Sequence, residues 1–133
     1  RTGAVGTVLT MELDDPAGYG RVIRDAEGSV ARIVEHRDAR PEELAVREVN
    51  SSIYILPSTE TMEILGGLGT DNDQKEVYLT DVVAVLNRRG ERLAAIKLDD
   101  PTLVLGVNSR EELAEAERLM RSGDGASACG GAG

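Results

Sequence analysis

The sequence predicts an α/β domain with an inserted antiparallel β-hairpin. After residue 48, β-rich runs alternate with helical apolar patterns, as in α/β proteins. Before residue 48, two short β-rich runs flank a tight turn, which is the pattern of a hairpin. The chain has 133 residues, no Trp, no Phe and three Tyr. It therefore has the length of one domain, and we expect Val, Leu, Ile and Ala to form its core.

The first half of the chain is predicted to consist mainly of strands. We expect strands over residues 7–13, 21–24, 29–35 and 49–56, with the second and third forming the hairpin around Gly28. Pro41 is placed to start a short helix that runs through Val46. No earlier strand is available to pair with residues 7–13, so we expect that strand to leave an unprotected sheet edge.

The second half is predicted to alternate between helix and strand. A helix from Pro57 stops at Gly66 and Gly67, and residues 68–77 form an exposed polar loop. Thr80 and Asp81 are expected to cap a helix that ends at Gly90. Strands over residues 93–98 and 103–107 follow, separated by a turn. Ser109 and Glu112 then form a capping box at the start of the last helix.

Composition excludes several kinds of function. Fifteen Lys and Arg against 24 Asp and Glu give a net charge of −9, which argues against a nucleic-acid partner. The single His36 cannot form a multi-histidine metal site. The single Cys129 excludes an internal disulfide and suits a reducing compartment. No apolar run approaches the ~20 residues of a membrane span, and no signal-peptide pattern is visible.

The two ends of the sequence lead to two expectations. Because the chain starts with Arg1 inside a strand pattern, we expect a piece of a longer chain, or a processed or trimmed form. Residues 122–133 are rich in Gly, Ala and Ser, and they carry too little apolar surface to offset the entropy of ordering them. We therefore expect a disordered tail, in which Cys129 has no catalytic role.

The segment LDDPAGYGRVIRD, residues 13–25, contains candidates for ligand binding. Asp14 and Asp15 could bind a metal ion, but Asp next to Pro is typical of a turn, and we favour the turn. Gly18 and Gly20 could form an ordinary turn or allow close approach of backbone to a ligand. The residues themselves leave these two interpretations of the glycines open.

Three further polar residues end or interrupt strands. Glu35 ends a strand and could face a cleft or simply solvent. Asn50 lies in an apolar strand, so its amide needs a partner, which is either the fold or a ligand. Asn108 directly precedes a helix cap and could orient the turn or coordinate an ion. His36, between charged residues, is expected at the surface.

The order of five motifs adds a resemblance to a known family. LDDPAGYGRVIRD, IVEHRDA, EVNSSIY, VYLTDVV and GVNSREELAEAE follow one another in this order along the chain. In this order they resemble the uridylyltransferase domain of bifunctional N-acetylglucosamine-1-phosphate uridylyltransferase/glucosamine-1-phosphate acetyltransferases. This family belongs to the sugar-phosphate nucleotidyltransferases. The resemblance covers roughly residues 4–121.

The resemblance implies a fold and a reaction. The fold would be part of a Rossmann-like nucleotidyltransferase sandwich, with residues 1–121 as the C-terminal, sugar-binding half of the domain and residues 122–133 as the tail. The reaction would join UTP to N-acetylglucosamine 1-phosphate, releasing pyrophosphate and forming UDP-N-acetylglucosamine. It would serve cell-wall (peptidoglycan) precursor synthesis in the cytoplasm, with neither nucleic acid nor membrane as partner.

The resemblance also implies a site. Gly20 would offer its backbone to the sugar nucleotide, and Glu35 and Asn50 would hydrogen-bond the N-acetylglucosamine hydroxyls or amide. Thr80 would lie beside the sugar, and Asn108 would ligate the catalytic Mg²⁺. No protein nucleophile is visible, which suits a reaction that depends on alignment and charge neutralisation.

Departures from the family pattern leave alternatives open. The nucleotide-binding Gly-rich loop, its Arg and Lys, and the second Mg²⁺ ligand would precede this sequence, and the acetyltransferase repeats would follow it. We therefore expect negligible turnover from this chain alone. Ser52 stands where the family usually has Gly, and Lys75 and Val77 also depart. The alternative is a non-catalytic sugar-nucleotide-binding or interaction module, whose sheet edge pairs with another chain or a second copy. A further alternative keeps the enzyme class but changes the nucleotide, because this sequence does not distinguish uridine from thymidine or guanosine as the base.

Overall fold

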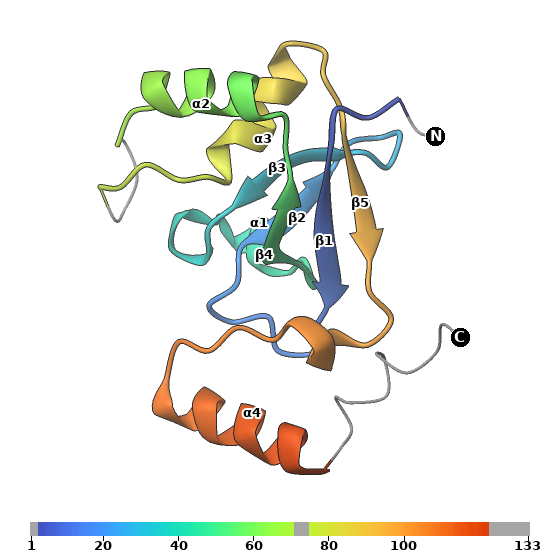
Figure 1. Cartoon of the computed structure of the whole chain (residues 1–133), viewed down its shortest axis with the longest axis vertical. Helices are drawn as coiled ribbons and strands as arrows, with labels where there is room; N and C mark the ends of the chain where they lie inside the picture. Colours follow the sequence, from blue (N-terminus) through green and yellow to red (C-terminus); the bar gives the residue numbers. More distant parts are fainter. Residues whose placement is uncertain (1–2, 71–74, 123–133) are drawn as a thin grey trace. The chain divides into compact units, whose positions relative to one another are not determined.

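The computed structural model describes residues 3–70 and 75–122 (Figure 1), and these fall into two compact units, one ending at Leu98 and one beginning at Asp99. The predicted tail lies outside the described residues except for Ser122, and so does Cys129. The first unit is a five-stranded sheet with helices. Its elements are β1 (Gly6–Glu12), β2 (Arg21–Arg24), β3 (Val30–Val34), η1 (His36–Asp38), α1 (Pro41–Leu44), β4 (Glu48–Ile55), α2 (Ser58–Gly67), α3 (Asp81–Arg88) and β5 (Leu93–Lys97).

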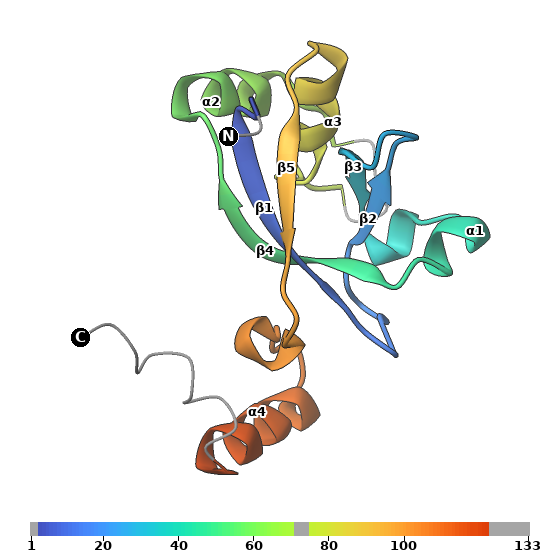
Figure 2. The same ribbon diagram turned by 90° about the vertical axis from the view of Figure 1, so that its right-hand side faces the viewer.

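The strand order of the sheet is β3-β2-β4-β1-β5, which confirms the mixed α/β class. β2 and β3 form the predicted antiparallel hairpin. β1 pairs antiparallel with β4 and parallel with β5, and the three strands run side by side in Figure 2. The expectation that the first strand is an unprotected edge is therefore wrong. Strands from later in the chain join both sides of β1, so that β3 and β5 are the outer strands of the described sheet.

The core lies between one face of the sheet and the two helices α2 and α3. Apolar side chains of the strands meet Ile64 of α2 and three residues of α3. α3 carries its apolar residues at helical spacing, which places them together on one face. Aliphatic side chains form this core, as the composition predicts. The buried residues of this core are Val8, Val22, Val30, Ile33, Ile64, Val82, Val83, Leu86 and Leu93.

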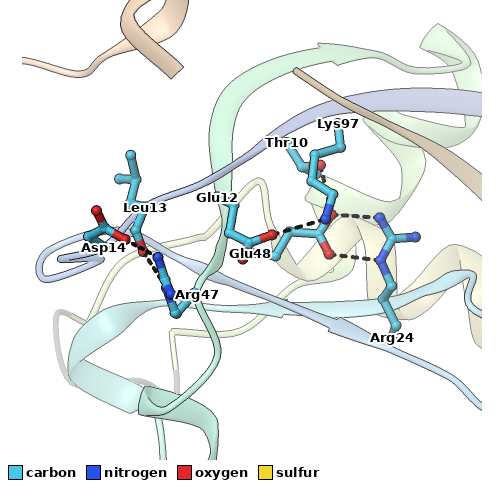
Figure 3. A network of polar contacts seen from close by, with 8 residues as sticks. All are labelled: Thr10, Glu12, Leu13, Asp14, Arg24, Arg47, Glu48 and Lys97. Atoms are coloured by element: carbon cyan, nitrogen blue, oxygen red, sulfur yellow. Dashed lines mark hydrogen bonds and ion pairs between the residues drawn. The ribbon is translucent and has the colours of Figure 1, made fainter. Parts of the chain in front are cut away.

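A charged network joins β4 to the neighbouring strands β1 and β2, at the point where the backbone pairing between β2 and β4 is short. β2 and β4 share a single paired position, Arg21 with Val49. Glu48 accepts hydrogen bonds from Arg24 Nε at 2.8 Å and from Thr10 Oγ1 at 2.7 Å, so that one carboxylate joins three strands (Figure 3). Burial alone would raise the pKa of Glu48, but the hydrogen bonds from Arg24 and Thr10 hold it below its usual value.

The predicted helices are present, although α1 ends at Leu44 rather than Val46 and α3 at Arg88 rather than Gly90, and the structure differs from the predictions in three further details. α2 ends at Gly67, as the glycine pair predicts, but both glycines are still helical and the helix runs two residues beyond Leu65. Thr80 has helical backbone angles and makes no side-chain cap bond, because its hydroxyl bonds elsewhere. The strand expected over residues 103–107 is absent, and residues Pro101–Val104 form the 3-10 helix η2. Asp100 accepts a bond from the Thr102 N–H at 2.9 Å, which starts that turn of helix instead.

The second unit contains η2 and the helix α4 (Arg110–Ser122). Its predicted capping box is confirmed. The Ser109 hydroxyl accepts a bond from the Glu112 N–H at 3.1 Å, and the Glu112 carboxylate accepts one from the Ser109 N–H at 3.1 Å.

Candidate functional site

The loop of residues 14–20 is built by its own aspartates and by Arg21. Asp15 accepts a bond from the Ala17 N–H at 3.2 Å, and Asp14 pairs with Arg47. The buried Arg21 guanidinium donates to the carbonyls of Pro16, at 2.7 Å, and Tyr19. Burial lowers the pKa of Arg21, and the charge of Asp15 opposes this. Both aspartates thus serve the turn that the sequence favoured, and the loop is tied to the start of β2.

Gly20 ends this loop at the candidate site. Its carbonyl accepts a bond from the Asn50 N–H at 2.9 Å, which holds the loop against β4. A Cβ added here would lie 3.2 Å from Ile33 Cγ2 and 3.6 Å from both oxygens of Glu35. Because φ of Gly20 is not positive, close approach rather than backbone angle explains the glycine. The missing side chain leaves the Glu35 carboxylate accessible from this side.

A bulge in β4 shapes the opposite wall. β1 residues Val8 and Thr10 pair with Tyr54 and Asn50, so two steps along β1 match four along β4. Asn50 Oδ1 accepts a bond from the Ser52 N–H at 3.0 Å inside the bulge. With its carbonyl oxygen thus occupied, the Asn50 amide NH₂ remains available as a donor. The oxygen of the Asn50 amide therefore stabilises the bulge, while Asn50 also lines the candidate site.

These elements enclose a pocket of about 200 Å³. Thr80 donates its hydroxyl to Glu35 Oε1 at 3.1 Å, joining residues 45 positions apart in the sequence. Three of the five predicted site residues, Glu35, Asn50 and Thr80, line the pocket, and Gly20 adjoins it through Glu35 and Asn50. The full lining is Glu35, Asn50, Ser52, Tyr54, Val77, Tyr78, Leu79 and Thr80.

Tyr54 is a lining residue that the sequence analysis did not single out. Its hydroxyl is buried and makes no hydrogen bond to the described residues. Burial raises the pKa of Tyr54 far above its usual value; the side chain of Asn50 opposes this rise, and the charge of Glu35 adds to it. The four-residue spacing from Asn50 was the available signal, since alternate residues of a strand share a face.

The chemistry of the lining favours a neutral, polyhydroxylated ligand. Glu35 accepts hydrogen bonds, Asn50 can donate them, and hydroxyl groups can do both. None of the lining residues is Lys, Arg or His, and the Glu35 carboxylate would repel a phosphate. The volume lies below the ~300–1,000 Å³ of pockets for drug-sized ligands, so it suits one sugar ring.

Asn108 lies in the second unit, and its relation to the pocket stays a prediction. Its side chain is exposed, and its backbone N–H donates to the Glu112 carboxylate. Within residues 3–70 and 75–122, no group of three or more His, Cys, Asp or Glu could hold a metal ion. The described residues therefore offer Mg²⁺ no carboxylate cluster.

Comparison with known proteins relates the chain to a segment of longer proteins. No family model matches the chain. Over 119 residues, 90% of the chain, it is 49% identical to the bifunctional protein GlmU of Pelotomaculum thermopropionicum. The GlmU of Geobacter metallireducens is 49% identical over 120 residues. The chain is homologous to a segment of bifunctional GlmU proteins. It spans only 26% of the first GlmU relative and 25% of the second.

A solved structure supports the fold of this GlmU-like segment. A Bacillus anthracis protein described as a glucose-1-phosphate thymidylyltransferase, solved with sucrose, superposes with a TM-score of 0.63 at 20% identity. The match covers 89% of this chain and 44% of that protein. At this identity the likeness concerns the fold alone, and it supports the predicted Rossmann-like α/β sandwich. No helix among the described residues has the length and apolar character needed to cross a membrane.

Proposed function

We propose that this chain is the sugar-binding part of a sugar-1-phosphate uridylyltransferase that forms UDP-N-acetylglucosamine. The observation that carries the proposal is the pocket in which Glu35, Asn50 and Thr80 converge beside Gly20. Its acceptors and donors are those that sugar hydroxyls and an acetamido group require. The homology to GlmU supports the same ligand. Residues 1–121 would be the sugar-binding half of the domain.

In the whole protein, an oxygen of N-acetylglucosamine 1-phosphate would attack the α-phosphorus of UTP. The bond from that phosphorus to pyrophosphate would break, and UDP-N-acetylglucosamine would form. This displacement needs no protein nucleophile, since alignment and charge neutralisation lower its barrier. The part of this chain would be to hold and orient the sugar. The cationic groups for the phosphates would come from outside the pocket, whose lining has none.

Magnesium would neutralise phosphate charge in such a reaction. Mg²⁺ is usually held by one or two carboxylates together with substrate phosphates. Asn108 would contribute one neutral oxygen, and the described residues add no acidic cluster. The described residues by themselves therefore do not fit a Mg²⁺ site. The second Mg²⁺ ligand would come from a segment that the GlmU relatives have and this chain does not span. The proposed reaction would take place in the cytoplasm.

Calorimetric titration of this chain with UDP-N-acetylglucosamine, with and without Mg²⁺, tests the proposal. We expect saturable binding that Glu35→Gln and Asn50→Ala each weaken about tenfold or more, because each removes a ligand contact. Glu27→Gln is the matched control, since Glu27 is exposed in the hairpin turn and outside the pocket. Thermal melts verify that each variant is folded. Absence of binding by the folded chain would contradict the proposed function.

A non-catalytic interaction module is the second candidate, favoured by one observation. The sheet face opposite α2 and α3 carries exposed Ile53, Ile55 and Ile96. Contiguous exposed apolar surface marks interaction sites. In that case the chain would bind a protein or a second copy through this face, whether or not the pocket holds a sugar.

A further inference from the structure

Ser52 adopts a backbone conformation that costs free energy. Its φ is +66°, in the left-handed region, and the only other described non-glycine residue with positive φ is Lys75. Such residues persist where the surroundings impose them, and they gather at ligand sites. Glycine would adopt the same angles without strain.

The fold itself explains the backbone of Ser52 but not its side chain. The bulge is held by the Ser52 N–H on Asn50 Oδ1 and by Ser51, whose hydroxyl donates to the Leu9 carbonyl at 2.8 Å and accepts from the Ile53 N–H at 3.3 Å. All these bonds use the backbone of Ser52 or the side chains of its neighbours. The Ser52 hydroxyl is exposed and bonds to none of the described residues. Glycine at this position would keep every one of these bonds.

The position of Ser52 in the pocket lining offers a reason for a serine, rather than a glycine, at this strained backbone position. Ser52 lines the pocket together with Asn50 and Glu35. We propose that the Ser52 hydroxyl is a sugar-contacting group that adds a hydrogen bond to those of Glu35 and Asn50, and that the strained serine is retained for this contact. The inference rests on the proposed function, because it assumes that the pocket holds the sugar of a nucleotide sugar.

Two substitutions separate the contact from the strain. Ser52→Ala removes the hydroxyl and keeps a Cβ at positive φ, whereas Ser52→Gly removes both. We expect each variant to weaken binding of UDP-N-acetylglucosamine to this chain about three- to tenfold, the value of one hydrogen bond. Only Ser52→Gly should raise the urea midpoint of unfolding, because only it relieves the strain. Greater stability with weaker binding is the signature of a residue kept for function.

The outcomes distinguish this inference from the proposed function. If Ser52→Ala and Ser52→Gly bind like the wild type while Asn50→Ala loses binding, the sugar site stands and the role of Ser52 is refuted. If the folded wild-type chain binds no UDP-N-acetylglucosamine, both proposals fail. Lys75→Gly is the matched control, since it relieves a comparable φ of 55° at a residue outside the pocket lining. It should raise the urea midpoint and leave the affinity unchanged.

Discussion

Tyr54 brings a hydroxyl group into the packed side of β4, where Asn50 and Glu35 are its polar neighbours. A buried hydroxyl without a partner costs about 1–3 kcal/mol relative to one that is satisfied. The apolar ring, in contrast, packs against the core cluster. At the scale of one residue, the ring of Tyr54 thus stabilises the fold, and its oxygen does not.

Tyr54→Phe removes only that oxygen, so we expect no loss of stability and a gain of up to about 1 kcal/mol in the free energy of unfolding. Urea denaturation followed by circular dichroism measures this. Tyr19→Phe is the control, because it makes the same chemical change outside the pocket. A loss of 1 kcal/mol or more in Tyr54→Phe would mean that the hydroxyl is hydrogen-bonded to Asn50 in solution.

The short helix α1 is attached to the sheet through one buried carboxylate. Glu43 is only 5% exposed, and it accepts bonds from the Arg40 side chain at 2.9 Å and the Arg40 N–H at 2.8 Å. It also pairs with Arg32 of β3. The hydrogen bonds from Arg40, then that from Arg32, lower the pKa of Glu43 to about 2. A four-residue helix could not persist alone, so this cluster holds it in place.

The lowered pKa predicts an acid-dependent loss of stability. Above the unfolded-state pKa of about 4.5 the Glu43 carboxylate stabilises the fold fully, and this contribution falls as the pH drops from there through about 2. We expect about 1–3 kcal/mol of the unfolding free energy to be lost over that range. Glu43→Gln should lack this part of the pH dependence. Urea unfolding at pH 7, 5, 3 and 2 measures it, and equal slopes in both proteins would contradict the prediction.

Between elements, the loop and the strand that form the site are positioned together. The β2–β4 junction has one ladder pair, and next to it the Asn50 N–H binds the Gly20 carbonyl. The Glu48 network lies at the start of the same strand (Figure 3). Because Gly20 and Asn50 are fixed to each other by a backbone hydrogen bond, the proposed sugar-binding residues keep their spacing without a ligand.

At the scale of the whole molecule, the sheet has two unlike faces. Val8 and Tyr54 face the helices, whereas Ile55 and Ile96 belong to the opposite face, since they pair with Thr7 and Leu9 of β1. Ile53, Ile55 and Ile96 are 45%, 74% and 53% exposed. Large exposed apolar side chains on one face of a sheet are usually buried against a further layer, so this face is the one we expect to form contacts with another surface.

We expect the isolated chain to self-associate through this face as its concentration rises, because burying apolar surface is favourable. Ile55→Thr keeps a β-branched residue in β4 and should shift association to higher concentration. Met62→Thr, on α2 with 69% exposure, removes apolar surface elsewhere and serves as the control. Sedimentation velocity over a concentration series measures both. A strictly monomeric wild type at high concentration would contradict the prediction and weaken the interaction-module candidate.

Sequence by itself determined the local features of this protein. The hairpin, the capping box of Ser109 and Glu112, and most element bounds follow from interactions between residues a few positions apart. The candidates Gly20, Glu35, Asn50 and Thr80 also came from the sequence, through the order of its motifs. The local features depend on residue type and short-range spacing, which a sequence displays directly, whereas the roles of the candidates are what the family resemblance implies.

Only the tertiary structure decided what depends on distant residues. It placed β1 inside the sheet, because β4 and β5 come from later in the chain. It turned the Thr80 hydroxyl from the expected cap to Glu35, and it brought these two residues into one pocket with Asn50 and the strained Ser52 of β4. Strand order and pocket lining are set by packing between segments tens of residues apart, for which local propensity carries no information.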